Sequence, residues 1–338
     1  MIHEATEILG RKIDLSYGQM EAVMEEIMTG KAQTAEIVSF LTGLNRKGET
    51  LDEIIAAVKV MRRHATKVQV NKDVILDTCG TGGDKKGTFN VSTAVAFVAS
   101  GCGICVAKHG NRAVSSSCGS ADILEALGIN INMHKEQIEL CLNEVGIGFL
   151  FAPNFHPAMK YAMPARKLMA TKTIFNILGP LTNPAGATHQ LVGVYEPKWT
   201  EILARVLGDL GTEHALVVHG EDGMDEVSIS TKTFISEAHK GKITNYEIIP
   251  QDIGFKKAEH KDLTGGTAMD NARIIMEILK GKPGPKRDIV ILNAAVALYT
   301  ADKAKDIKEG ITLAAESIDS GNALIKLDLL KDYSHQAK

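Results

Sequence analysis

The sequence predicts an α/β protein in which a small helical N-terminal domain precedes a larger domain built on a mostly parallel central sheet. Residues 1–70 repeat apolar side chains every three or four positions, which is the helix period, and show no strand-like alternation. From residue 74 onward, short segments that are apolar throughout alternate with helical patterns. Such uniformly apolar strands are typical of parallel sheets whose two faces are covered by helices.

The size and charge of the chain agree with this class. Its 338 residues suggest about two domains of ~150 residues each. The 38 Lys and Arg residues against 41 Asp and Glu give a net charge of -3, which argues against a surface that holds nucleic acid. No apolar run approaches the ~18 residues needed to span a bilayer, and the first residues lack the apolar core of a secretion signal. We expect a soluble, cytoplasmic protein that binds neither nucleic acid nor membrane.

The helical domain is placed at residues 1–72. Three segments carry the helix period most strongly: residues 20–28, 34–44 and 51–65. Thr50 and Glu53 form a capping-box signature ahead of the third segment. Gly30 and Gly48 separate the helices.

The α/β domain is placed at residues 73–338. Its expected apolar strands are residues 74–77, 104–108, 191–195, 214–220 and 288–293. The last of these is expected to lead into a helix over AAVALYTA, and residues 227–249 alternate like antiparallel strands. Residues 157–186 interrupt the rhythm with helical character and several prolines, and we expect this segment to pack with the helical domain.

The cysteines do not indicate a disulfide framework. There are five, an odd number, and all lie between residues 79 and 141. Cys102 and Cys105 have C-x-x-C spacing, but the sequence holds no second such pair to complete a zinc site. Because they lie in an apolar, Ala-rich run, we interpret them as small buried side chains.

The turns after Asp77, Lys108 and His219 are the candidate site, because ligands of open α/β sheets bind beyond the carboxyl ends of the strands. The first turn, DTCGTGGDKKGTFNVST (77–93), is rich in glycine, which lets backbone N–H groups approach an anion. The helix that begins near Ser92 adds the positive end of its dipole. The spacing fits neither the dinucleotide-binding nor the P-loop pattern.

The other two turns strengthen this hypothesis. The second, residues 108–122, offers Lys108, Arg112, Asn111 and several hydroxyls, which together favour a phosphate site over a merely solvated loop. The third, residues 219–226, holds four carboxylates within six residues. Hard oxygen clusters of this kind suit Mg²⁺ shared with a phosphate, although an exposed acidic loop remains the alternative.

Arg166 and the histidines are less specific. Arg166 lies in PARKLMATKT and would be the natural cation for a substrate carboxylate. An exposed basic face of a helix would give the same sequence pattern. The eleven histidines show no clear metal-ligand spacing. Apart from His109, we interpret them as surface or core residues.

In combination, these motifs resemble those of the anthranilate phosphoribosyltransferase family along nearly the whole chain. The matching segments are DTCGTGGD (77–84), NVST (90–93), KHGNRAVSS (108–116), GSADILEALG (119–128), FNILGPLTNP (175–184) and DE (225–226). The resemblance implies a nucleoside phosphorylase-like phosphoribosyltransferase fold and a homodimer with its active site between the two domains. It also implies the reaction of anthranilate with phosphoribosyl pyrophosphate in tryptophan biosynthesis, with Mg²⁺.

The resemblance also implies roles for individual residues. Phosphoribosyl pyrophosphate would contact Gly80, Gly83, Asp84, Thr88, Asn90, Val91, Ser92, Thr93, Lys108, His109, Gly110, Asn111, Arg112, Ala113, Val114, Ser115, Ser116 and Ser120. Magnesium would be held by Ser92, Asp225 and Glu226. Anthranilate would meet Gly80, Asn111 and Arg166, with His109 close by.

The chain departs from the family pattern at one point. Where the family usually reads R-x-x-L-G-x-R-T, Met169-Ala170 replaces Leu-Gly and Lys172 replaces the second Arg. This change bears on the local helix geometry and leaves the phosphate turns intact.

Two alternatives remain open at this level. A pyrimidine nucleoside phosphorylase of the same fold usually reads H-S-T-G-G-V-G-D in the first turn, where this chain has CGTGGD (79–84). A non-catalytic nucleic-acid-binding relative would carry a basic surface and lack the acidic pair, whereas here Asp225 and Glu226 are present.

Overall fold

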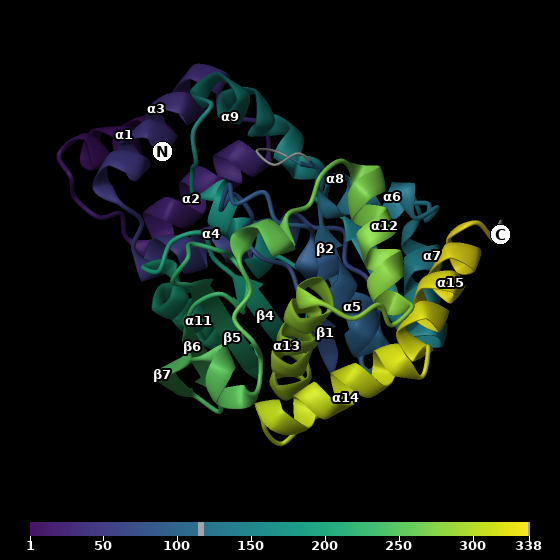
Figure 1. The fold of residues 1–338 in the computed structure, drawn as a ribbon. Helices are drawn as coiled ribbons and strands as arrows, with labels where there is room; N and C mark the ends of the chain where they lie inside the picture. The colour runs from purple at the N-terminus through teal and green to yellow at the C-terminus, as the bar shows by residue number, and fades with distance from the viewer. Residues whose placement is uncertain (114–117, 337–338) are drawn as a thin grey trace. The chain divides into compact units, whose positions relative to one another are not determined.

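A computed structural model describes residues 1–113 and 118–336, which divide into two compact units (Figure 1). One unit comprises Met1–Lys67 and Pro153–Pro184. The other comprises Val68–Ala152 and Ala185–Lys338. None of the helices in the described part of the chain has both the length and the apolar character needed to cross a membrane.

The first unit is helical. It contains α1 (Ile2–Gly10), α2 (Tyr17–Met28), α3 (Thr34–Lys47), α4 (Leu51–His64), the end of α8 (Ala152–Phe155), α9 (Met163–Met169) and α10 (Phe175–Leu178). Helix α2 packs on α4, while α3 packs on both α1 and α9. Fully buried side chains such as Met20, Ile27 and Phe40 form the core between these helices.

The predicted capping box before α4 is confirmed, and it has a second role. The Thr50 hydroxyl accepts from the Glu53 N–H (3.3 Å), and the Glu53 carboxylate accepts from the Thr50 N–H (2.8 Å). Glu53 is fully buried, where it also accepts from Lys47 Nζ (2.8 Å) and from the Leu15 N–H (2.9 Å). These bonds satisfy a carboxylate that would otherwise be costly to bury.

The second unit is built on a seven-stranded sheet in the order β3-β2-β1-β4-β5-β6-β7. The strands are β1 (Ile75–Asp77), β2 (Cys105–Gly110), β3 (Ile147–Phe151), β4 (His189–Gly193), β5 (His214–Gly220), β6 (Thr233–His239) and β7 (Lys242–Ile248). The first five in chain order pair in parallel, and β6 and β7 pair antiparallel. The predicted fold class is therefore confirmed, including the antiparallel pair expected within residues 227–249.

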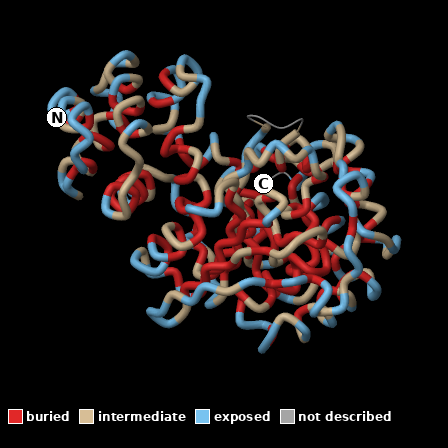
Figure 2. The backbone as a smooth tube through the Cα atoms, turned by 60° about the vertical axis from the view of Figure 1, so that its left-hand side comes forward, coloured by how far each residue is buried: buried red, intermediate tan, exposed pale blue. Residues whose placement is uncertain are grey.

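Helices surround this sheet. They are α5 (Val91–Gly101), α6 (Ser120–Ala126), α7 (Lys135–Leu140), α11 (Trp199–Asp209), α12 (Ala268–Leu279), α13 (Pro285–Thr300), α14 (Ile307–Asp319) and α15 (Asn322–Ser334). Helix α13 contacts β4 and β5, α5 contacts β2, and α11 contacts β5 and β6. Because both faces are covered, β1, β3, β4 and β5 are buried along their whole length, and the buried residues gather at the sheet (Figure 2).

The strand expected at residues 288–293 is wrong, because this segment is the middle of α13. Pro285 occupies the first turn of the helix, and Asn293 bonds from within it to the Ile289 carbonyl at 2.9 Å. Helix α13 packs against α5, α14 and the sheet, so apolar residues lie on every face of this helix. A short run that is apolar throughout does not distinguish a buried helix from a buried strand.

The expectation that Cys102 and Cys105 are buried is confirmed for Cys105 and not for Cys102. All five lie in the described part of the chain, and none of them forms a disulfide. Cys105 is buried, and burial raises the pKa of its thiol to about 11. Cys102 is half-buried and its thiol donates to the Leu313 carbonyl.

Candidate active site

The turn after β1 is held against the end of β4. The Thr81 N–H donates to the Gly193 carbonyl (2.8 Å), and a Cβ placed on Gly80 would lie 2.8 Å from that same oxygen. Gly82 and Gly83 follow with φ of +64° and +81°, in the left-handed region that favours glycine. The turn thus needs its glycines both for close approach and for its backbone path.

Helix α5 begins directly after this turn. The Asn90 side chain accepts from the Thr93 N–H (3.0 Å) and caps the helix, while the Asn90 N–H donates to Asn271 Oδ1 (2.9 Å). Asn271 belongs to α12 and is almost fully buried. A helix 181 residues further along the chain therefore fixes the start of α5. Sequence reasoning missed Asn271, because no local pattern marks so distant a contact.

Lys108 is a buried cation beside the N-terminus of α5. Its side chain is almost fully buried, and Nζ donates to Ser92 Oγ (3.1 Å) and to the Thr78 carbonyl (3.3 Å). The helix N-terminus carries a partial positive charge of its own. Two positive groups in one buried place favour an anion there.

The turn after β2 is tied to its neighbours by backbone hydrogen bonds. The His109 N–H donates to the buried Asp77 carboxylate (3.1 Å), which links β2 to the end of β1. The Asn111 carbonyl accepts from the Ala121 N–H (3.2 Å). The N-cap of α6 is Gly119, and Asp122 accepts from the Gly119 N–H (2.9 Å). Val114, Ser115, Ser116 and Ser117 lie outside the described residues.

Arg112 is already paired in this structure. Its guanidinium contacts Asp122 (2.7 Å) and both oxygens of Glu125 (2.5 and 2.8 Å), and these carboxylates raise the pKa of Arg112 above its usual value. Both partners belong to α6. A phosphate near this turn would have to share Arg112 with them or draw it away.

The four carboxylates of the third turn separate into two pairs with different roles. Asp222 is structural, because it accepts from the Ser228 hydroxyl (2.7 Å) and from the Met224 N–H (3.2 Å). Glu221 is exposed, with Lys232 Nζ 3.8 Å from its carboxylate.

Asp225 and Glu226 instead turn toward the loops after β1 and β2. Burial and the nearby Asp84 carboxylate raise the pKa of Asp225 to about 7. Burial and the charge of Asp225 raise the pKa of Glu226 well above its usual range, while Lys108 and a hydrogen bond from the Ser92 backbone act in the opposite direction. Asp225 and Glu226 are half-buried. Crowded carboxylates of this kind, partly removed from solvent, are typical of a site that receives a cation.

The same cluster fits Mg²⁺ by its donor chemistry. Asp84 Oδ2 is buried and accepts no hydrogen bond from any residue that the structure describes. Carboxylate and hydroxyl oxygens are the ligands Mg²⁺ prefers, and because the ion keeps several waters they need not all converge on one point. Of the three predicted ligands, Ser92 and Glu226 are joined by a hydrogen bond, and Asp225 interacts with Glu226.

Arg166 lies in the first unit, on α9. Burial lowers the pKa of Arg166, its guanidinium stacks 5.6 Å from the Phe175 ring centroid, and Nη1 lies 3.9 Å from Met163 Sδ. Among residues 1–113 and 118–336, no carboxylate pairs with it. A half-buried guanidinium without an acidic partner is suited to a carboxylate ligand.

The departure from the family pattern has a visible consequence at the end of α9. Ala170 terminates the helix in the left-handed conformation, with φ of 50° and ψ of 27°. This is the position at which the family usually has glycine, the residue favoured in that conformation.

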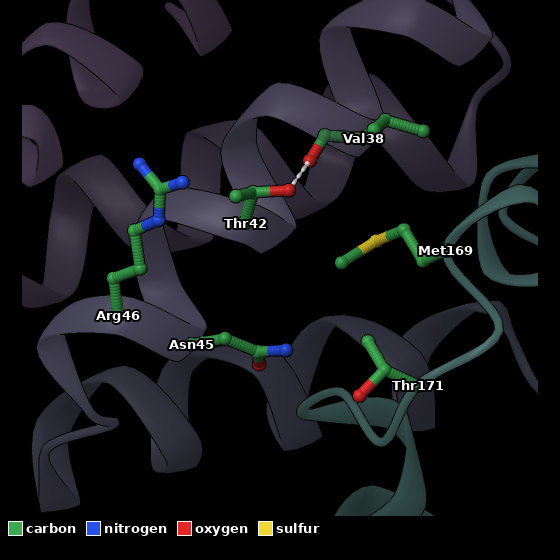
Figure 3. Close-up of a pocket in the computed structure, with 6 residues that line it drawn as sticks. All are labelled: Val38, Thr42, Asn45, Arg46, Met169 and Thr171. Carbon is green, nitrogen blue, oxygen red and sulfur yellow. Dashed lines mark hydrogen bonds between the residues drawn. The ribbon is translucent and has the colours of Figure 1, made fainter.

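The first unit also has a pocket of about 360 Å³ between α3 and the C-terminal end of α9 with the residues that follow it, lined by Val38, Thr42, Asn45, Arg46, Met169 and Thr171 (Figure 3). Thr42 Oγ1 donates to the Val38 carbonyl (2.7 Å) in this pocket (Figure 3). None of the site residues expected from the sequence lines it.

Comparison with known proteins places these features in a family. Residues 72–324 match the model of the glycosyl transferase family a/b domain, and residues 3–65 match that of its helical bundle domain. The anthranilate phosphoribosyltransferase of Alkaliphilus metalliredigens is 51% identical over 338 residues, which cover 100% of each chain. That of Symbiobacterium thermophilum is 51% identical over 96% of this chain and 95% of the relative.

Solved structures of anthranilate phosphoribosyltransferases are also similar to this chain. The anthranilate phosphoribosyltransferase of Thermus thermophilus matches with a TM-score of 0.93 at 40% identity, over 98% of this chain and 99% of that one. The Saccharomyces cerevisiae enzyme, in complex with PRPP and Mg, matches with a TM-score of 0.91 at 31% identity, over 98% and 97%. The chain therefore belongs to the anthranilate phosphoribosyltransferase family.

Proposed function

We propose that the protein transfers the phosphoribosyl group of phosphoribosyl pyrophosphate to the amine of anthranilate. The products are N-(5-phosphoribosyl)anthranilate and pyrophosphate, which is a step of tryptophan biosynthesis. The observation that carries the proposal is the buried Lys108, which lies against the N-terminus of α5 and interacts electrostatically with the half-buried Glu226. This arrangement suits a pyrophosphate group bound together with a divalent cation.

The phosphoribosyl pyrophosphate site we propose keeps the residues expected from the sequence. They are Gly80, Gly83, Asp84, Thr88, Asn90, Val91, Ser92, Thr93, Lys108, His109, Gly110, Asn111, Arg112, Ala113, Val114, Ser115, Ser116 and Ser120. The strongest structural support is at Ser92 and Lys108, whose hydroxyl and ammonium groups are 3.1 Å apart.

Magnesium would be held by Ser92, Asp225 and Glu226. When bound, it neutralises part of the charge on pyrophosphate and so makes this a better leaving group. Its supporting observations are the crowded, half-buried carboxylates of Asp225 and Glu226 and the buried Asp84 oxygen without a donor among the described residues. The yeast relative solved with PRPP and Mg is consistent with this proposal.

Anthranilate would be oriented through its carboxylate by Arg166, with Gly80, Asn111 and His109 forming the rest of its site. The bond between the anomeric carbon and pyrophosphate breaks with its electron pair on the leaving oxygen, through an oxocarbenium-like state. The aryl amine is uncharged at neutral pH, so its lone pair forms the new C–N bond and its proton is then lost. Lys108 and the N–H groups of α5 stabilise the departing charge.

The proposal is tested by mixing purified protein with anthranilate, phosphoribosyl pyrophosphate and Mg²⁺ and following anthranilate fluorescence. We expect loss of fluorescence with release of pyrophosphate, abolished by a chelator and restored by excess Mg²⁺. Phosphorolysis of thymidine or uridine in place of this reaction would favour the phosphorylase alternative and contradict the proposal.

We further propose that the protein acts as a cytoplasmic homodimer. Exposed apolar side chains on the first unit support a partner surface there, with Leu168 72% and Met163 38% exposed. Sedimentation of the purified protein would show a mass of two chains if this is correct and of one chain if it is not.

A further inference from the structure

A row of three histidines crosses the sheet at the amino ends of β4 and β5, away from the turns that form the candidate active site. His189 pairs with His214, and His214 pairs with His239, in the register of β4, β5 and β6. Residues directly opposite each other on neighbouring strands share a face of the sheet. Glu237 precedes His239 by two residues on β6, so it points to that same face.

We propose that His214, Glu237 and His239 form a binding site for a divalent cation of the zinc class. One ligand atom from each of the three lies within 4.8 Å of the other two. Glu237 Oε1 is 2.9 Å from His214 Nε2 and 3.9 Å from His239 Nδ1, and the two imidazole rings stack with centroids 4.0 Å apart. Two imidazole nitrogens and one carboxylate, with a fourth position left open, are a donor set that suits Zn²⁺ and disfavours Mg²⁺.

The groups around the three ligands strengthen the proposal. Asp302 Oδ1 lies 3.0 Å from His214 Nδ1, which leaves Nε2 directed at Glu237. The Tyr299 hydroxyl donates to Glu237 Oε1 (3.0 Å). A carboxylate behind one ring nitrogen, with the other nitrogen facing the metal, is the common arrangement for histidine ligands.

Access and rigidity are also consistent with a site. His214 is fully buried and fixed by strand pairing, so its position is set before any ion arrives. The His239 side chain is 28% exposed and Glu237 is 11% exposed, which gives an ion a route from solvent. An imidazole nitrogen binds a metal in the plane of its ring, so the half-exposed His239 ring must turn out of its stack on His214 before both nitrogens can bind one ion.

The experiment is calorimetric titration of the tag-free, full-length protein with Zn²⁺ in the presence of excess Mg²⁺. The Mg²⁺ occupies oxygen-rich sites and does not compete for imidazole. The variants are His239→Ala, Asp302→Asn and, as a matched control, His260→Ala, which removes an exposed imidazole elsewhere in the same unit. Thermal unfolding without metal verifies that each variant is folded.

We expect one Zn²⁺ per chain in the unchanged protein and in His260→Ala, and loss of that site in His239→Ala. Asp302→Asn should weaken binding roughly 10–100-fold and, because Asp302 is 52% exposed, should fold even if His239→Ala does not. Co²⁺ substitution should give visible bands without thiolate absorption, which separates this site from the Asp77, Cys79 and His109 group. Two results would overturn the proposal. One is no Zn²⁺ uptake by the unchanged protein. The other is Zn²⁺ binding by His239→Ala and Asp302→Asn with the affinity and stoichiometry of the unchanged protein.

Discussion

Gly193 offers a direct perturbation of the acidic turn without changing any charged residue. It ends β4, and a Cβ placed on it would lie 1.6 Å from the Asp225 carbonyl oxygen. Real Cβ contacts essentially never fall below 3.0 Å, so in Gly193→Ala the backbones of residue 193 and Asp225 must separate by about 1.4 Å. A displacement of this size at a positioned group costs about 100-fold in rate. We therefore expect kcat/KM to fall about 100-fold, equivalent to about 2.7 kcal/mol.

The assay is the initial rate of anthranilate consumption as Mg²⁺ is varied, together with near-ultraviolet circular dichroism to verify folding. Displacing Asp225 should also raise the Mg²⁺ concentration required for half-maximal rate. The matched control is Gly208→Ala on α11, whose new Cβ would meet Ala238 at an ordinary 3.8 Å and should leave the rate unchanged. A folded Gly193→Ala protein with a rate within twofold of the unchanged protein would refute the assignment of this turn.

Three further predictions concern single residues. Ala170→Gly should raise the free energy of unfolding by about 0.5–1 kcal/mol, measured by denaturant titration, because φ is 50° there; a decrease would contradict the strain. Burial lowers the pKa of His156 from 6.5 to about 4, so the unfolded chain binds the extra proton first as pH falls. Stability should be complete above pH 6.5 and fall by about 3 kcal/mol toward pH 4, a slope that His156→Gln should remove; an unchanged slope would refute this. Arg166→Ala should raise KM for anthranilate far more than KM for phosphoribosyl pyrophosphate, and equal rises would exclude the carboxylate role.

The fold class was predictable from local sequence patterns. The errors in the predicted strands have a common physical origin. Strands β1, β2, β4 and β5 were predictable because short apolar segments end in polar turns. Strand β3 (Ile147–Phe151) was not predicted, and the segment over 288–293 was assigned to the wrong element. Both are apolar runs whose partners lie elsewhere in the chain, so periodicity alone does not decide between helix and strand.

The candidate site was predictable where adjacent residues share a loop and not where distant segments meet. Ligands of open α/β sheets bind beyond the carboxyl ends of the strands, and this rule predicted a shared site for the loops after Asp77, Lys108 and His219. The contact of Gly193 with Asp225 and the bond of Asn271 to Asn90 depend on tertiary packing, which no local spacing encodes. The same reason explains why His214 and His239 were taken as ordinary core or surface residues, since strand register alone makes them neighbours.

The most direct test of the central claim is the stoichiometry of the reaction. Purified protein with anthranilate, phosphoribosyl pyrophosphate and Mg²⁺ should form one N-(5-phosphoribosyl)anthranilate, identified by mass spectrometry, for each pyrophosphate released. Pyrophosphate release without an anthranilate adduct, or no reaction at saturating substrates and Mg²⁺, would contradict the account.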